Sequence, residues 1–167
     1  GSDAALLEFD APRLPFSSGL QNVYVSLLNN GGDTLTSVDI HWEVNGVAQS
    51  TFAWTGTLSS SQSEDSISIG NFNFMTDTNY TLKAWTSLPN GNADILAAND
   101  TIQSTNIFAA LSGTYTIGGT TPDFSDFTSA VAALQARGIS NNVVFDIRDG
   151  VYDEYIKIIR FAKTNSM

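Results

Sequence analysis

Oxygen-bearing side chains gather between residues 90 and 100, in a glycine-containing loop and just after it. Calcium takes several hard oxygen ligands, often from such loops. The loop lacks the spacing of an EF-hand and its closing glutamate, and Asn, Asp and Gly are also the ordinary residues of turns. Two interpretations stay open: a plain turn, or a calcium site built from Asn92, Asp94, Asn99 and Asp100. We expect no cofactor unless calcium binds here.

His41 is the single histidine of the chain and lies between Asp39 and Glu43 in an alternating segment. A divalent ion could in principle bridge two of these side chains. Residues two apart on a strand are about 6.6 Å apart along its axis, which is wide for a tight site. Because such polar residues usually face solvent, we expect a solvated row and no metal here.

Three tryptophans could offer flat faces for stacking on sugars. Trp42 shares the parity of the apolar residues of its segment, which predicts a core position. Trp85 has the opposite parity to Leu82 and Ala84, and Trp54 stands at the end of its segment. We expect Trp54 and Trp85 to be the candidates for an exposed ligand-binding patch. Burial in the core is the alternative for each, because large apolar groups are usually buried.

The last third of the chain contains carboxylates at short spacing: Asp123, Asp126, Asp146, Asp149, Asp153 and Glu154. General acid–base pairs need a shared cleft and shifted pKa values. We expect capping and turn roles for these residues instead. The sequence contains no nucleophile elbow, phosphate loop or zinc motif. We therefore predict no catalytic residues and no enzymatic activity.

The elements that must position these residues are strands. In the stretch 35–49, apolar residues alternate strictly with polar ones around Trp42. Successive side chains on a strand point to opposite faces, so this stretch predicts a half-buried strand. Asn45-Gly46 then tolerates the positive φ angles that a tight hairpin requires.

Composition limits the classes of function. The chain has 167 residues and a formal net charge of −10, and such a chain repels phosphate backbones, so we expect no nucleic-acid partner. Residues 1–110 carry a net charge of −9 and residues 111–167 carry −1, which indicates a domain boundary near residue 111. The sequence has no apolar run long enough to span a membrane.

Short alternating segments with turn residues between them fill the first part. We expect strands at 5–9, 20–29, 47–54, 66–74, 79–85 and 101–108, besides the one around Trp42. About seven such strands at this spacing are typical of an antiparallel immunoglobulin-like β-sandwich, here placed at residues 5–110.

The same segments carry a family resemblance. It rests on Val23–Gly32, on Trp42–Gly46, on Tyr80–Ala84 and on Ala98–Thr101. These runs resemble bacterial cell-adhesion-related (CARDB-type) immunoglobulin-like domains. The resemblance implies an accessory module of surface or secreted proteins, and it implies no catalysis.

The pattern changes after Ala110. A strand ending in Gly118-Gly119 precedes a helical period over 124–137, with Asp123 or Ser125 as its expected cap and Gly138 as its end. Strands are expected at 143–147 and 152–159. Together these elements form a short helix-capped β segment over 111–167.

This segment also resembles a known family. The matching residues are Gly113–Gly119, Asp123-Phe124, Ala130-Val131 with Leu134, Gly138-Ile139, Val143–Phe145 and Gly150–Tyr152. They resemble the start of pectate-lyase-like right-handed parallel β-helix domains, in which a helix caps the solenoid. The resemblance implies a truncated N-terminal cap and first coil, with the catalytic coils absent. A solenoid buries its core only by stacking repeats, so exposed tail strands could self-associate.

These observations favour a non-catalytic adhesion or spacer module of a larger secreted or surface bacterial protein. Its location would be extracellular or at the cell surface, and its partner a glycan or a protein. Two alternatives stay open: a fragment of a polysaccharide-processing β-helix enzyme without its active coils, or a carbohydrate-binding module.

Overall fold

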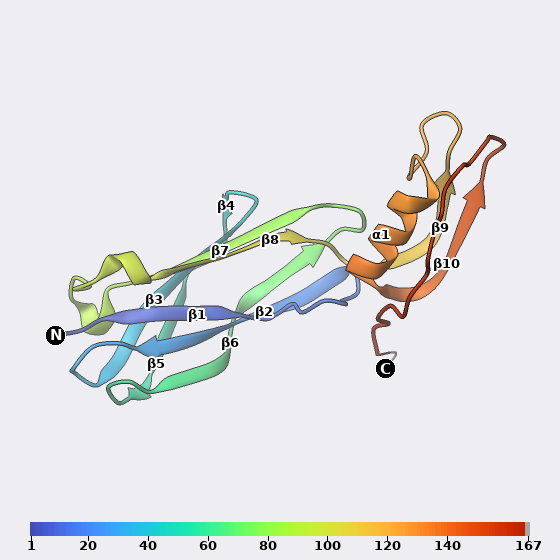
Figure 1. Cartoon of the computed structure of the whole chain (residues 1–167). Helices are drawn as coiled ribbons and strands as arrows, with labels where there is room; N and C mark the ends of the chain where they lie inside the picture. Colours follow the sequence, from blue (N-terminus) through green and yellow to red (C-terminus); the bar gives the residue numbers. More distant parts are fainter. Residues whose placement is uncertain (166–167) are drawn as a thin grey trace. The chain divides into compact units, whose positions relative to one another are not determined.

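A computed structural model describes residues 1–165 of the chain as a mostly β protein (Figure 1). Contacts divide it into two units. The first consists of residues 1–13, 20–73 and 79–107, and the second of residues 14–19, 74–78 and 108 onward. The expected boundary near residue 111 therefore falls at Phe108, and two segments from the first part of the sequence belong to the second unit. The expected second segment ran to residue 167, and residues 166–167 lie outside the described part.

Antiparallel strands build the first unit. They are β1 (Ala4–Ala11), β2 (Gly19–Asn29), β3 (Leu35–Val44), β4 (Val47–Ala48), β5 (Phe52–Leu58), β6 (Ser63–Phe74), β7 (Tyr80–Ser87) and β8 (Thr101–Ile107). One sheet has the order β1-β2-β6, and the other has the order β4-β3-β7-β8 with β5 also paired to β3. The expected strand over 47–54 is thus two strands, β4 and β5. The antiparallel sandwich is confirmed.

Trp42 on β3 shows how the two sheets meet. Burial alternates along β3, and Val38, Ile40, Trp42 and Val44 are all buried, as the sequence predicts. A Cβ atom added to Gly70 of β6 would lie 2.8 Å from the Trp42 ring, so the ring packs directly on the backbone of the opposite sheet. The Trp42 indole also donates to the carbonyl of Ser50 at 3.1 Å, which satisfies its polar atom in the core.

The second unit is built on a parallel pair. β9 (Leu111–Ile117) leads to α1 (Phe127–Arg137), and β10 (Ile139–Ile147) returns parallel to β9. Leu111, Tyr115 and Leu134 form its core, with Phe124 and Phe145 against them. A crossover helix between parallel strands is the usual way to close such a unit, and Figure 1 shows α1 beside both strands.

The start of α1 differs from the sequence prediction. The helix begins at Phe127, not at residue 124, because Asp126 is its N-cap and accepts from the backbone of Ser129 at 2.8 Å. Asp123 does not cap it; its carboxylate accepts from the backbone and hydroxyl of Thr116. The expected helix end is confirmed, since Gly138 has φ 67° and its N–H donates to Leu134.

No strand forms over residues 152–159, contrary to expectation. The side chains here bind the rest of the unit instead. The Tyr152 hydroxyl donates to the carbonyls of Arg148 (2.7 Å) and Ile117 (3.2 Å), and Glu154 accepts from the backbone of Phe127 and Thr128 at 3.0 Å each. Between residues 148 and 165 the chain pairs again only at Lys163, which forms a parallel bridge with Ile139.

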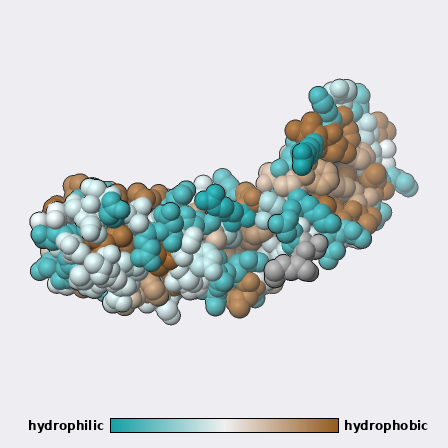
Figure 2. Space-filling model, turned by 90° about the horizontal axis from the view of Figure 1, so that it is seen from below, coloured by the Kyte–Doolittle hydropathy of each residue, from teal (hydrophilic) through white to brown (hydrophobic). Residues whose placement is uncertain are grey.

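Apolar side chains on this second unit remain on the surface. Hydrophobic surface is prominent over it in Figure 2. The most exposed apolar residues near its end are Val144, Ile147, Val151, Tyr155, Ile158 and Ile159, each at least half exposed. The expected exposed apolar face is therefore present.

Candidate metal centre

Three aspartates meet at one end of the sandwich. Asp3 directly precedes β1, Asp94 lies between the short 3-10 turns η1 (Pro89–Gly91) and η2 (Ala97–Asn99), and Asp100 directly precedes β8. Each offers one carboxylate oxygen, and the three oxygens all lie within 4.8 Å of one another.

Hydrogen bonds from β7 and from the connection between β7 and β8 to Ala4, the first residue of β1, bring the aspartates together. The hydroxyl of Thr86, on β7, donates to the carbonyl of Ala4 at 2.6 Å. The N–H of Ala4 in turn donates to Oδ2 of Asp94 at 3.1 Å. The first strand therefore places Asp3 next to a loop that is distant in sequence.

Two of the three carboxylates are almost wholly buried. Asp3 is 2% exposed and Asp100 is 5% exposed, whereas Asp94 is half-buried. Asn30 donates its side-chain amide to Oδ2 of Asp3 at 2.9 Å. Oδ1 of Asp3 and Oδ1 of Asp100 are buried without any hydrogen-bond partner, as is Oδ1 of the neighbouring Asn99. Buried polar atoms are normally paired with protein groups, ordered water or an ion, so these oxygens are free to accept a cation.

The electrostatics of the cluster also call for a positive charge. Burial, together with the nearby charges of Asp94 and Asp3, raises the pKa of Asp100 to about 6. Two unit charges at this separation repel by about 3.5 kcal/mol at an effective dielectric constant of 20. A divalent cation between the three carboxylates would turn this repulsion into attraction.

The donor set selects the kind of ion. Asp3, Asp94 and Asp100 supply only hard carboxylate oxygens, without the nitrogen or sulfur ligands typical of zinc. Calcium binds oxygen at about 2.3–2.6 Å, so two ligands on opposite sides of one ion are about 5 Å apart. The observed spacing therefore fits a single calcium ion.

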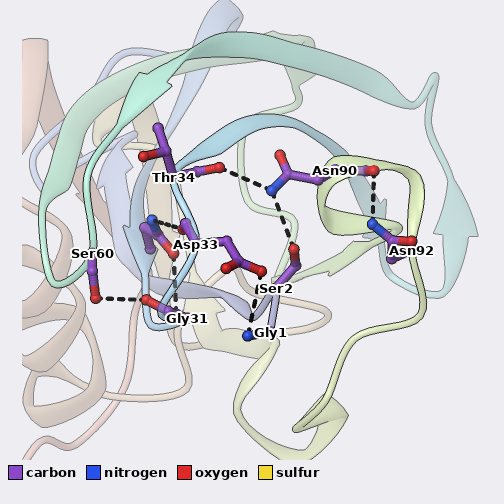
Figure 3. A network of polar contacts seen from close by, with 9 residues as sticks. Gly1, Ser2, Gly31, Asp33, Thr34, Ser60, Asn90 and Asn92 are labelled. Atoms are coloured by element: carbon purple, nitrogen blue, oxygen red, sulfur yellow. Dashed lines mark hydrogen bonds and ion pairs between the residues drawn. The ribbon is translucent and has the colours of Figure 1, made fainter.

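Polar contacts hold Gly1, Ser2 and the start of the loop at Asn90 (Figure 3). Asn90 donates to the hydroxyl of Ser2 (3.1 Å) and to the carbonyl of Thr34 (2.9 Å), and its side-chain oxygen accepts from the backbone of Thr36 at 2.7 Å. The terminal amine of Gly1 lies 3.3 Å from the carboxylate of Asp33. These contacts fix the side of the site next to Asn90, and none of them requires a metal ion.

The structure brings together part of the predicted calcium set. Asp94 and Asp100 converge, and Asn99 contributes a buried oxygen close by in sequence. Asn92 is exposed and donates its side-chain amide to the carbonyl of Asn90 at 3.0 Å, which is a turn contact. Asp3 was not predicted, because nothing in its local sequence shows that β1 starts beside this loop.

The ring of His41 is held by its neighbours on the sheet. Its ring nitrogens pair with the hydroxyls of Ser87 (2.7 Å) and Thr51 (2.9 Å), and its ring stacks on Trp85 with centroids 5.6 Å apart. His41 and Trp85 are cross-strand partners on the outward face of the sheet. The expected polar row is confirmed at His41.

The two candidate tryptophans differ. Trp54 is 4% exposed, so the expectation that it lies in an exposed patch is wrong. It pairs with the buried Val38 across the sheet, its ring packs against Gly56, and its indole donates to Glu64 at 3.0 Å. Trp85 is partly exposed, with the amine of Lys83 5.4 Å from its ring centre.

Solved structures of CARDB domains resemble about two thirds of the chain. A crystal structure of a CARDB domain from Pyrococcus furiosus in complex with di-metal ions has a TM-score of 0.48 and 16% identity, covering 64% of this chain and 89% of that one. A solution NMR structure of the same domain has a TM-score of 0.49 and 17% identity, covering 65% of this chain and 95% of that one. A solution NMR structure of a domain of a candidate cell surface protein from Methanosarcina acetivorans has a TM-score of 0.49 and 19% identity, covering 64% of this chain and 91% of that one.

No family model matches the sequence, and no curated protein matches it. None of the three structural matches is to a parallel β-helix. Within residues 1–165, no helix is both long and apolar enough to cross a membrane.

Proposed function

We propose that this chain is a non-catalytic adhesion or spacer module of a larger secreted or surface bacterial protein, and that its sandwich binds calcium. One observation carries the proposal: Asp3 and Asp100 are buried, close together, and each has a carboxylate oxygen without a partner. Calcium at millimolar concentration is available outside cells and weak extracellular sites use it, so such a site suits an extracellular module.

Thermal unfolding in calcium and in EDTA tests this proposal. A ligand that binds only the folded state raises its stability, so calcium should raise the melting temperature of the sandwich by several degrees. Asp3→Asn should lose most of that increase. Asp65→Asn removes the same charge at an exposed position of β6, and this variant should keep the calcium-dependent increase in melting temperature. An increase that survives in Asp3→Asn would refute the site.

We further propose that the second unit is the cap and first coil of a parallel β-helix. β9 and β10 pair in parallel from Gly113 and Val143 to Ile117 and Ile147, and the chain returns parallel to Ile139 at Lys163. The start of a third parallel rung supports this interpretation. Nuclear Overhauser contacts between the backbones of Ile139 and Lys163 test it; without them, the third rung does not exist.

Carbohydrate binding is the second candidate function of the module. Trp85 favours it, because this partly exposed indole lies on a polar sheet face beside His41 and Lys83. Aromatic faces with polar neighbours suit the apolar faces and hydroxyls of sugars. A glycan array tests this role, and no binding by the intact chain would count against it.

A further inference from the structure

We infer that calcium holds the segment 91–99 against the first strand through Asp94, and that the segment opens when calcium is removed. We call this segment the latch. This inference rests on the proposed calcium site and adds to it a moving part. The segment begins at the last residue of η1, ends with η2 and directly precedes Asp100, so both of its ends are next to fixed structure.

The segment is not held by apolar burial. Residues 91–93 and 95–98 are all exposed, and Ile95 and Leu96 expose 65% and 50% of their surface. Asp94 is half-buried and lies between these exposed stretches. A stretch with so little buried apolar surface belongs to the low-stability part of a protein.

Two hydrogen bonds attach the segment to the start of the chain. Oδ2 of Asp94 accepts from the N–H of Ala4 at 3.1 Å, and the N–H of Ile95 donates to the carbonyl of Ser2 at a longer 3.3 Å. Inside the segment, Oδ1 of Asp94 accepts from the N–H of Leu96 at 2.8 Å. The attachment of the segment to the first strand therefore depends mainly on the carboxylate of Asp94.

The charge of that carboxylate makes closure depend on the cation. Closing the segment brings Asp94 toward the buried carboxylates of Asp3 and Asp100. Without a cation, like charges in a poorly solvated place oppose closure. With calcium, the same three groups become ligands of one ion, and closure is favoured.

Asn90 marks the fixed end of the latch. Its side chain bonds Ser2, Thr34 and Thr36, and none of these contacts involves a carboxylate. Asn90 also has φ 52°, a left-handed conformation that sets the direction of the chain that follows. The part that opens is therefore the segment after Asn90.

Amide hydrogen exchange of the intact chain, measured by NMR with calcium or with EDTA, tests the latch. The N–H groups of Ala4 and Leu96 report directly, because both donate to Asp94. In EDTA they should exchange at least tenfold faster than in calcium. The N–H groups of Ile40 and Trp42, in the centre of β3, should exchange at the same rate in both conditions.

Asp94→Asn and Asp65→Asn form a matched pair for this measurement. The carboxamide of Asp94→Asn can still accept from Ala4 but carries no charge, so its exchange rates should no longer respond to calcium. Asp65→Asn should respond like the unchanged chain.

Calorimetric titration of the same samples separates the two claims. If calcium binds and the Ala4 and Leu96 rates do not change, the latch is wrong and the calcium site stands. An equal change of rate at Ile40 and Trp42 would also refute the latch, since the effect would then be global. If calcium does not bind, the proposed site fails and the latch fails with it.

Discussion

Asp3 and Asp100 each place a carboxylate oxygen within 4.8 Å of the other, inside a protein that buries both side chains. Neither side chain pairs its Oδ1 atom. Two like charges in this position destabilise the fold unless a cation joins them. This relationship is the basis of the proposed calcium site.

The packing of Trp42 on Gly70 predicts that alanine substitutions at two glycines differ sharply in their effect on the free energy of unfolding. Gly70→Ala places a Cβ 2.8 Å from the Trp42 ring at φ +151°, so we expect a loss of about 2 kcal/mol in the free energy of unfolding. Gly32→Ala is the control, because a Cβ there meets nothing within 4 Å. Urea denaturation of both variants measures the difference, and equal stabilities would contradict the packing described.

Arg137 is predicted to stabilise the second unit. The side chain is buried, donates to the carbonyl of Ala109 at 3.1 Å and to Asp77 at 2.6 Å, and lies over the ring of Phe108. Arg137→Gln should lower the free energy of unfolding by about 2 kcal/mol, because it leaves a buried carbonyl without its partner.

Arg148→Gln is the control variant for Arg137→Gln. Arg148 is largely exposed and pairs with the exposed Asp146 at 3.5 Å, so its loss should cost under about 0.5 kcal/mol. Thermal denaturation of both variants compares them. A larger loss from Arg148→Gln than from Arg137→Gln would refute the assigned role.

We predict that the contact of Glu154 with the start of α1 weakens in acid. Hydrogen bonds from Thr128 and Phe127 hold the pKa of Glu154 below its usual value. A lowered pKa in the folded state contributes stability above the unfolded pKa, and that contribution is lost as the pH falls through the folded value. The contact of the 152–159 segment with α1 should therefore loosen in acid.

Glu154→Gln tests this dependence. The amide can still bind the helix start but does not titrate, so the exchange of the Phe127 and Thr128 amides should lose the pH response that Glu154 provides. An unchanged pH response, compared with the unaltered chain after correction for intrinsic exchange, would exclude Glu154 as its source.

Trp85 predicts the position of any glycan contact on the sandwich. Trp85→Ala should weaken binding to a glycan found on an array by at least tenfold, because the stacking face is removed. Tyr155→Ala is the control, since Tyr155 is an aromatic residue that is 93% exposed on the second unit. Surface plasmon resonance compares the variants, and equal affinities would exclude Trp85 from the contact.

Local patterns predicted the elements but not the contacts between them. Trp42 was placed in the core by alternation alone, and Gly138 was placed at the helix end by its position after Arg137. Both depend on residues close in sequence. Trp54 was misplaced, because its burial depends on the register that pairs it with Val38 on another strand.

The candidate metal centre shows the same dependence on contacts between residues distant in sequence. Asp94 and Asp100 were selected from one oxygen-rich loop, whereas Asp3 joins them only through the contact of β1 with that loop. In the second unit, Tyr152 and Glu154 fall in the segment expected as a strand. Their hydrogen bonds to Arg148 and to the start of α1 replace strand pairing, which no local period could indicate.

Isothermal titration of calcium into the EDTA-treated and dialysed chain tests the central claim most directly. We predict saturation at one ion per chain, and at least a tenfold weaker affinity for Asp100→Asn at unchanged folding. No binding by the unaltered chain, or equal affinity in Asp100→Asn, would contradict a calcium site at these three aspartates.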